Sequence, residues 1–201
     1  MMTQLGSLKI LEVMSEAVNV IAEGEVLQLM NIHDADLSVP DYLRVIRFKT
    51  AKLFEASARL GAVLANVDLE TEECCASYGR SLGTAFQLVD DLLDYEGDPH
   101  ALGKNVGDDL REGKPTLPLL IAMERGTAAE RELIRHAIEH GEVQGLPQIV
   151  DVVRRTGALD ATRELAQREA DQASESLRVL PSSVARDALL DLCVRSVHRS
   201  F

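Results

Sequence analysis

The chain has 201 residues, a formal net charge of −12 and no Trp. That length suffices for one domain with a sizeable core, and a composition rich in Ala, Leu, Val and Glu favours helices over sheets. The acidic balance argues against nucleic acid or an anionic membrane surface as the main partner, because both would repel the protein. An anionic small ligand would need local lysines or metal ions to bind.

The cysteines indicate reduced thiols rather than a disulfide framework or a zinc site, because their count is odd and two are adjacent: Cys74, Cys75 and Cys193. We expect them to pack as small hydrophobic side chains in a cytoplasmic protein. We also expect no signal peptide and no membrane span, since no apolar run approaches the roughly 20 residues that a span needs.

The hydrophobic pattern predicts an all-α chain, because apolar residues recur at helical spacing and no strand pattern is present. Gly and Pro mark most of the breaks between the predicted elements. We expect helices over residues 4–30, 38–65, 68–95, 115–125, 128–140, 146–155, 158–179 and 182–199.

The first of these helices has no recognisable cap in the sequence. Its apolar surface begins almost at Met1, whereas a domain normally starts with a capped helix or a disordered lead-in. The sequence therefore predicts that the chain begins inside an element of a larger domain.

Residues 83–95 are the stretch around which the chemistry is expected. At about 100° per residue, its polar positions fall on one arc about 100° wide: Gly83, Gln87, Asp90, Asp91 and Asp94. Apolar residues cover much of the remaining circumference, which is typical of a mostly buried helix. Because burying unpaired charge is very costly, the acidic strip should face a cavity, a cation, or both.

Lys49 lies on the apolar side of the preceding predicted helix, with Val45, Ile46 and Leu53 within one turn. Two interpretations are open. Either the ammonium group extends past these neighbours into solvent, or the residue brings a positive charge into the cavity of the carboxylates, with Thr50 beside it.

Residues 97–115 form a Gly-rich segment that carries Lys104, Asp108, Asp109 and Lys114 but few apolar side chains. Long loops in compact domains are usually functional or disordered. This segment is therefore either a solvated excursion or a loop that a metal-bound phosphate ligand orders.

Carboxylates without Cys or His favour a hard cation, and Mg²⁺ often combines one or two carboxylates with phosphate oxygens. Mg²⁺ on the acidic strip would create a diphosphate site, with further charge or hydrogen bonds from Lys49, Thr50, Gln87, Lys104 and Lys114. General acid–base catalysis by a carboxylate pair competes, but no carboxyl is isolated in an apolar pocket.

His136 and His140 are four residues apart on another predicted helix. Without a third ligand at metal-binding spacing, we expect them to be solvated rather than to hold a metal.

Several motifs together resemble the trans-prenyltransferases, the polyprenyl diphosphate synthases. Residues 86–94, FQLVDDLLD, are similar to the second aspartate-rich motif of that family. Further matches are GEVLQL at 24–29, KTA at 49–51, GKNVGDDL at 103–110 and EGKPTLP at 112–118. The resemblance extends from near Met1 to near Phe201 and is strongest to the bacterial members that make octaprenyl diphosphate for the ubiquinone side chain.

The resemblance implies a helical bundle of the isoprenoid-synthase type and a reaction in which isopentenyl diphosphate extends an allylic diphosphate. By motif match, Mg²⁺ would be held by Asp90, Asp91 and Asp94. The allylic diphosphate would contact Lys49, Thr50, Gln87, Lys104 and Lys114. Lys49, Asp90 and Asp91 would be catalytic, and the family pattern also implies a homodimer in the cytoplasm.

The sequence departs from the family pattern in lacking the first aspartate-rich motif, the paired arginines after it and the upstream residues that bind isopentenyl diphosphate. We therefore interpret residues 1–201 as the C-terminal part of a single polyprenyl synthase domain, incomplete at its N-terminus and inactive alone. Two alternatives are a non-catalytic helical subunit of a heteromeric prenyl diphosphate synthase, and a helical interaction domain with a coincidental acidic triplet.

Overall fold

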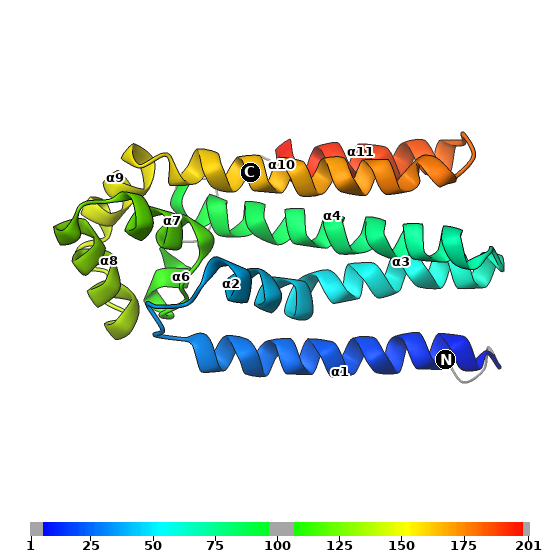
Figure 1. Ribbon diagram of the computed structural model, residues 1–201, viewed down its shortest axis with the longest axis horizontal. Coiled ribbons are helices and arrows are strands. Elements are labelled where there is room, and N and C mark those ends of the chain that lie inside the picture. The colour runs from blue at the N-terminus through cyan, green and yellow to red at the C-terminus, as the bar shows by residue number, and fades with distance from the viewer. Residues whose placement is uncertain (1–5, 97–106, 199–201) are drawn as a thin grey trace.

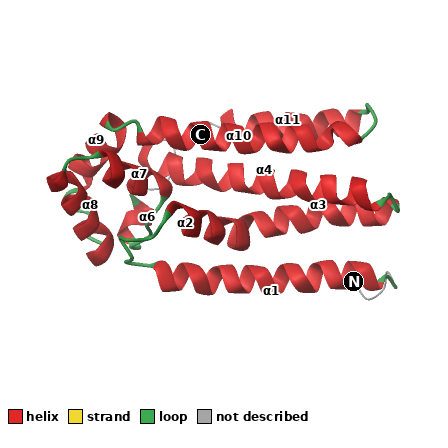
Figure 2. Ribbon diagram, viewed as in Figure 1, coloured by secondary structure: helices red, strands yellow, loops and turns green. Residues whose placement is uncertain are grey.

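The computed structural model describes residues 6–96 and 107–198, and every regular element within these ranges is a helix (Figure 2). The longer helices are α1 (Leu8–Asn31), α3 (Lys52–Ala65), α4 (Leu69–Glu96), α10 (Ala158–Ser176) and α11 (Val184–His198). The shorter ones are α2 (Val39–Ile46), α6 (Asp108–Arg111), α7 (Leu117–Arg125), α8 (Ala128–His140), α9 (Leu146–Arg155), the π-helix η2 (Arg47–Ala51) and the 3₁₀-helix η3 (Leu177–Val179). The prediction of an all-α chain is confirmed.

The long helices run beside one another along the length of the molecule, and the short helices α6 to α9 gather at one end (Figure 1). Helix α4 lies at the centre and packs mainly against α3 on one side and α10 on the other. Helix α1 lies at the edge, against η2 and α3. None of the helices in the described ranges is long and apolar enough to cross a membrane.

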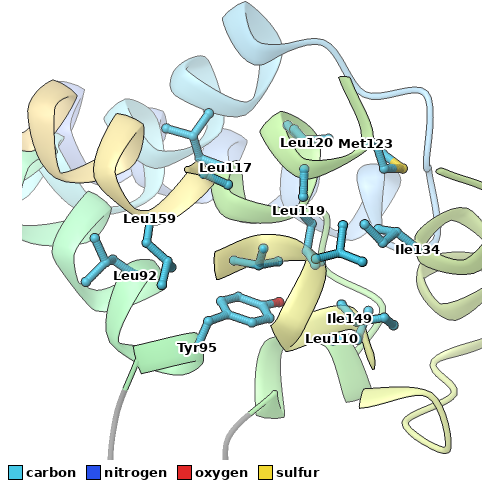
Figure 3. Close-up of a cluster of buried hydrophobic side chains, with 14 of the residues drawn as sticks. Leu92, Tyr95, Leu110, Leu117, Leu119, Leu120, Met123, Ile134, Ile149 and Leu159 are labelled. Atoms are coloured by element: carbon cyan, nitrogen blue, oxygen red, sulfur yellow. The ribbon is translucent and has the colours of Figure 1, made fainter. Parts of the chain in front are cut away.

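The main hydrophobic core fills the end of the bundle where α4 meets α6 to α9. Figure 3 shows Leu92 and Tyr95 of α4 in this cluster, together with Leu110, Leu117, Leu119 and Ile149 from the short helices. Tyr95 is fully buried, and its hydroxyl lies 3.4 Å from the Thr116 hydroxyl. This core anchors the C-terminal half of α4, which carries the acidic strip.

The start of the chain differs from the prediction of an uncapped first helix. Helix α1 begins at Leu8, and Ser7 caps it by accepting a hydrogen bond from the Ile10 backbone N–H at 3.4 Å. The prediction missed this cap because apolar residues on the N-terminal side of Ser7 suggested that the helix was already under way. Residues 1–5 lie outside the described part.

The predicted second helix is one rod with an irregularity in its middle. Helix α2 continues through the π-helical segment η2 into α3 without a turn between them. Segment η2 contains Lys49 and Thr50, and π-helical turns inside α-helices occur frequently at functional sites.

Glycine allows two neighbouring helices to contact η2 closely. A Cβ atom at Gly24 of α1 would lie 2.5 Å from the Lys49 backbone nitrogen, and one at Gly83 of α4 would lie 2.6 Å from the Ala51 Cα. Real Cβ atoms do not approach backbone that closely, so both positions require glycine. Helices α1 and α4 thereby hold η2 between them.

Candidate functional site

A cavity of about 450 Å³ opens between the C-terminal ends of α1 and α4, the α2–η2 rod, and the segment from α6 to α7. Its lining includes the predicted site residues that fall in the described ranges: Lys49, Thr50, Gln87, Asp90, Asp91, Asp94 and Lys114. Lys104, also predicted, lies outside the described residues. The lining also includes apolar side chains from the α1–α2 turn, α2 and α4: Ile32, Leu37, Val45, Ile46 and Leu93.

A chain of hydrogen bonds links η2 to the acidic strip on α4. The Thr50 hydroxyl donates to Gln87 Oε1 at 3.0 Å, and Gln87 Nε2 donates to Asp91 Oδ1 at 2.8 Å. The Tyr42 hydroxyl of α2 donates to the other oxygen of Asp91 at 2.5 Å. Asp91 is 4% exposed, so two neutral donors, from α2 and from α4 itself, hold a buried carboxylate in place, and Thr50 of η2 orients one of them.

Asp94 connects the strip to the short helix α6. Its two carboxylate oxygens accept the backbone N–H groups of Asp108 and Asp109, each at 3.2 Å. Its backbone carbonyl also accepts the Gly107 N–H at 3.0 Å. Helix α6, which was predicted as part of a loop, is therefore fixed to α4 at the edge of the cavity and adds two further carboxylates to its lining.

Two carboxyl groups of the cavity, Asp91 and Asp94, have raised pKa values. Burial raises the pKa of Asp91 to about 7, and the nearby Asp109 adds to that rise. Burial and Asp109 likewise raise the pKa of Asp94 to about 6. Burial and the adjacent Asp91 raise the pKa of the Tyr42 hydroxyl well above its ordinary value, so Tyr42 stays a hydrogen-bond donor.

The two described lysines of the cavity lie on different walls. Lys49 Nζ is 2.7 Å from Glu25 Oε2 of α1 and also donates to Gln28. The interpretation that Lys49 shares the cavity with the carboxylates agrees with this arrangement, but its partners belong to α1 rather than to α4.

Lys114 follows α6 and lies beside the acidic residues of that helix. Its Nζ is 3.1 Å from Asp109 Oδ1 and 2.6 Å from Glu112 Oε2. Although burial works against it, these two carboxylates hold the pKa of Lys114 above its usual value.

The donor set suits a hard cation, although the side chains are not already arranged as a cage. Five aspartates line one cavity: Asp90, Asp91, Asp94, Asp108 and Asp109. Within residues 6–96 and 107–198, no group of three or more His, Cys, Asp or Glu side chains is placed to hold a metal ion. Asp91 and Asp94 direct oxygens to protein donors instead. The raised pKa values of these two carboxyl groups nevertheless show that added positive charge would stabilise their ionised forms, so the residues fit a cation that arrives with an anionic ligand.

Residues outside the cavity behave differently. The His136 and His140 rings stack with their centroids 4.2 Å apart on the exposed face of α8, and neither lines the cavity. All three cysteines are free thiols, and Cys193 is buried.

Sequence reasoning provided no indication that Tyr42 would contact Asp91. It also treated Asp108 and Asp109 as loop residues rather than as part of the site. The aspartate pair directly after Gly107 was a usable signal, because glycine followed by acidic residues is a common way to begin a helix.

Comparison with known proteins gives consistent results. The model of the family described as polyprenyl synthetase matches residues 1–153. The chain is 56% identical over 200 residues to octaprenyl diphosphate synthase of Escherichia coli strain K12, a match that covers 99% of this chain and 62% of that protein. It is 48% identical over 202 residues to octaprenyl diphosphate synthase of Haemophilus influenzae, covering 100% of this chain and 61% of the relative.

A solved structure is similar over nearly the whole chain. The polyprenyl synthase from Caulobacter crescentus CB15, complexed with calcium and isoprenyl diphosphate, is 46% identical and superposes with a TM-score of 0.93. The match covers 98% of this chain and 61% of that one. The chain thus spans about three fifths of the length of the proteins that it matches.

Proposed function

Because the chain belongs to the polyprenyl synthetase family, we propose that its cavity binds an allylic diphosphate together with a divalent cation. The reaction served by this binding is the extension of a polyprenyl chain by isopentenyl diphosphate. The carbon–oxygen bond to the diphosphate breaks, a carbon–carbon bond to isopentenyl diphosphate forms, and a proton is lost.

The observation that carries this proposal is the surplus of carboxylates over lysines in the described lining of a cavity that is also lined by apolar side chains. Among the described lining residues, six carboxylates accompany two lysines. A diphosphate with divalent cations brings positive charge to the carboxylates and phosphate oxygens to the lysines. The apolar lining residues offer the hydrocarbon tail a surface away from water.

We assign Asp90, Asp91 and Asp94 to the cation, which we propose to be Mg²⁺. When bound, Mg²⁺ would offset the charge that develops on the departing diphosphate. Asp90 and Asp91 are proposed as catalytic through this role, and Tyr42 and Gln87 fix the direction of the Asp91 carboxylate.

The diphosphate side of the cavity is assigned to cations and neutral donors. Lys49 is proposed to neutralise phosphate charge as the third catalytic residue, helped by Thr50, Gln87, Lys104 and Lys114. Glu25 and Gln28 hold the Lys49 ammonium on the α1 wall before the ligand binds, so a bound diphosphate would exchange those partners for phosphate oxygens.

The proposal also includes finer points. The names of the E. coli and H. influenzae relatives support an octaprenyl product, and we propose that it serves the ubiquinone side chain. The calcium and isoprenyl diphosphate of the Caulobacter complex support a divalent cation beside the diphosphate. We further propose a cytoplasmic homodimer.

Calorimetry with the pure chain tests the binding site. Inorganic diphosphate should bind in the presence of Mg²⁺ and not in the presence of EDTA, and Asp90→Ala should abolish the Mg²⁺-dependent part. Equal binding by wild type and Asp90→Ala would exclude the assignment. That the chain alone does not condense farnesyl and isopentenyl diphosphates stays a prediction, and radiolabelled isopentenyl diphosphate in a long-chain product would contradict it.

A further inference from the structure

His33 lies in the turn between α1 and α2, next to the rim of the cavity. The residues before it, Asn31 and Ile32, line the cavity, as do Glu112 and Lys114 on the turn opposite. The backbone φ angle of His33 is 66°, a left-handed conformation that is uncommon for residues other than glycine, although Asn, Asp and His adopt it more often than the rest. The contacts of His33 stabilise it in this conformation.

Two hydrogen bonds provide such contacts, and they reach two different elements. The His33 backbone N–H donates to the Gly113 carbonyl at 2.8 Å. The ring nitrogen Nδ1 is 2.8 Å from the Ile138 carbonyl in the last turn of α8. Because a carbonyl can only accept, Nδ1 carries the hydrogen and donates it.

The His33 ring also packs directly against Gly113. A Cβ atom at Gly113 would lie 2.3 Å from His33 Nδ1 and 2.4 Å from Cε1, and the φ of Gly113 is 71°. The ring thus occupies the space that any other residue at position 113 would need. Gly141, just after α8, closes the other side, where a Cβ would lie 3.7 Å from His33 Cε1.

We propose that His33 is a positioning residue for the diphosphate site, which it serves by clasping the turn at Gly113 to the end of α8. Lys114 directly follows that turn, and its ammonium group pairs with Asp109 and Glu112. Fixing Gly113 fixes the point from which Lys114 extends into the cavity. The functional part of this inference rests on the proposed diphosphate binding, whereas the clasp itself does not.

A second tie, between the α1–α2 turn and α8, provides a matched control. Arg135 of α8 pairs with Asp36 of the α1–α2 turn and with Glu139, whereas Lys114 pairs with Asp109 and Glu112. Asp36→Ala should therefore weaken the attachment of the α1–α2 turn to α8 and leave the His33 clasp intact.

Three substitutions at position 33 separate the hydrogen bond from the backbone strain. His33→Asn keeps an N–H donor at the same number of bonds from the Cα and favours a positive φ, so it should preserve the clasp. His33→Ala removes the donor and keeps the strain. His33→Gly removes the donor and relieves the strain, and it gives a folded donor-free variant even where the alanine variant is unstable.

The test combines hydrogen–deuterium exchange of peptides covering residues 107–116 with calorimetry using Mg²⁺ and inorganic diphosphate. We expect faster exchange in this segment for His33→Ala and His33→Gly, and wild-type exchange for His33→Asn and Asp36→Ala. The affinity for diphosphate should fall by about threefold to tenfold in the two donor-free variants. That change corresponds to the usual contribution of one hydrogen bond.

Unchanged exchange of residues 107–116 in both donor-free variants would overturn the clasp. An equally faster exchange of residues 107–116 in Asp36→Ala would also overturn it, because His33 would then act only by attaching the α1–α2 turn to α8. Faster exchange with unchanged affinity would overturn the positioning role. If wild type itself bound no diphosphate, the proposed function and the positioning role would fail together, and the exchange data would still decide the clasp.

Discussion

The two halves of α4 carry acidic side chains that meet opposite surroundings. Around the N-terminal half, four carboxylates and four cations from α1, α3 and α4 form a network of ion pairs of 2.5 to 3.4 Å that joins these three helices. The acids are Glu16, Glu55, Glu72 and Glu73, and the bases are Lys9, Lys52, Arg59 and Arg80. In the C-terminal half, the described lining of the cavity has six carboxylates for two lysines.

The pKa values report this difference. Burial alone would raise the pKa of Glu55, yet hydrogen bonds from Arg80 and Lys52 hold it below its usual value. Asp91 is also buried and Asp94 is half-buried, and their pKa values rise to about 7 and about 6. Burial of an acidic residue therefore does not identify a binding site, whereas burial without matching charge does point to one.

The largest effect is expected from breaking the ion-pair network around the N-terminal half of α4. Glu55→Ala leaves Lys52 and Arg80 without their shared partner, and we expect it to lower the free energy of unfolding by about 1–3 kcal/mol, discounted because Arg80 is partly exposed. Urea unfolding measures this loss. Glu132→Ala, at an exposed position of α8, is the control and should change the free energy of unfolding by less than about 0.5 kcal/mol. A loss no larger than that of the control would show that the network contributes nothing.

The next effect concerns the cavity, whose described lining has more carboxylates than lysines. At ten times its dissociation constant, diphosphate with Mg²⁺ should stabilise the fold by about 1.4 kcal/mol through mass action, visible as a higher melting temperature. Glu55→Ala should keep the full increase from its lower baseline, and Asp90→Ala should lose it. Loss of the increase in Glu55→Ala would mean that the two halves of α4 are not independent.

A smaller change in stability should have opposite signs in the two halves of the bundle. Asp91→Asn removes a buried negative charge from among other carboxylates while keeping the shape of the side chain. Without ligand and near pH 8, we expect stability that is unchanged or higher by up to about 1 kcal/mol. The matching Glu55→Gln should lower stability. Clear destabilisation by Asp91→Asn would show that its hydrogen bonds with Tyr42 and Gln87 outweigh the charge.

The smallest effect is the pH dependence of the Glu55 contribution. Its folded-state pKa lies below the ordinary value of 4.5, so the stabilisation is present above about pH 4.5 and is lost as the pH falls through the folded-state pKa. The difference in unfolding free energy between wild type and Glu55→Gln should therefore narrow between pH 6 and pH 3. A constant difference across that range would contradict the depressed pKa.

The sequence was sufficient to predict the acidic strip because α4 is a regular helix. A fixed rotation per residue is enough to bring Gln87, Asp90, Asp91 and Asp94 to one side, and all four line the cavity. The buried character of α4 followed from the same pattern. No partner residue had to be known for these predictions.

Other parts of the site depend on contacts that the pattern does not contain. Tyr42 meets Asp91 across 49 positions of sequence, so its role needs the topology. Helix α6 has four residues and depends on Asp94 to hold its first amides. The partners of Lys49 could not be predicted because a 3.6-residue period does not anticipate a π-helical turn at η2.

That turn has a consequence for changes of chain length. A π-helical turn accommodates one residue more than an α-helical turn, so η2 takes up an extra residue without rotating α3 against α2. The same length of chain wound as a regular α-helix would rotate one half against the other by about 100°. Tyr42 and Glu55, on opposite sides of η2, could not then both keep their partners Asp91 and Arg80 on α4. Deleting a single residue within 47–51 is therefore the change of length that the cavity and the ion-pair network would tolerate best, whereas inserting one would disturb both.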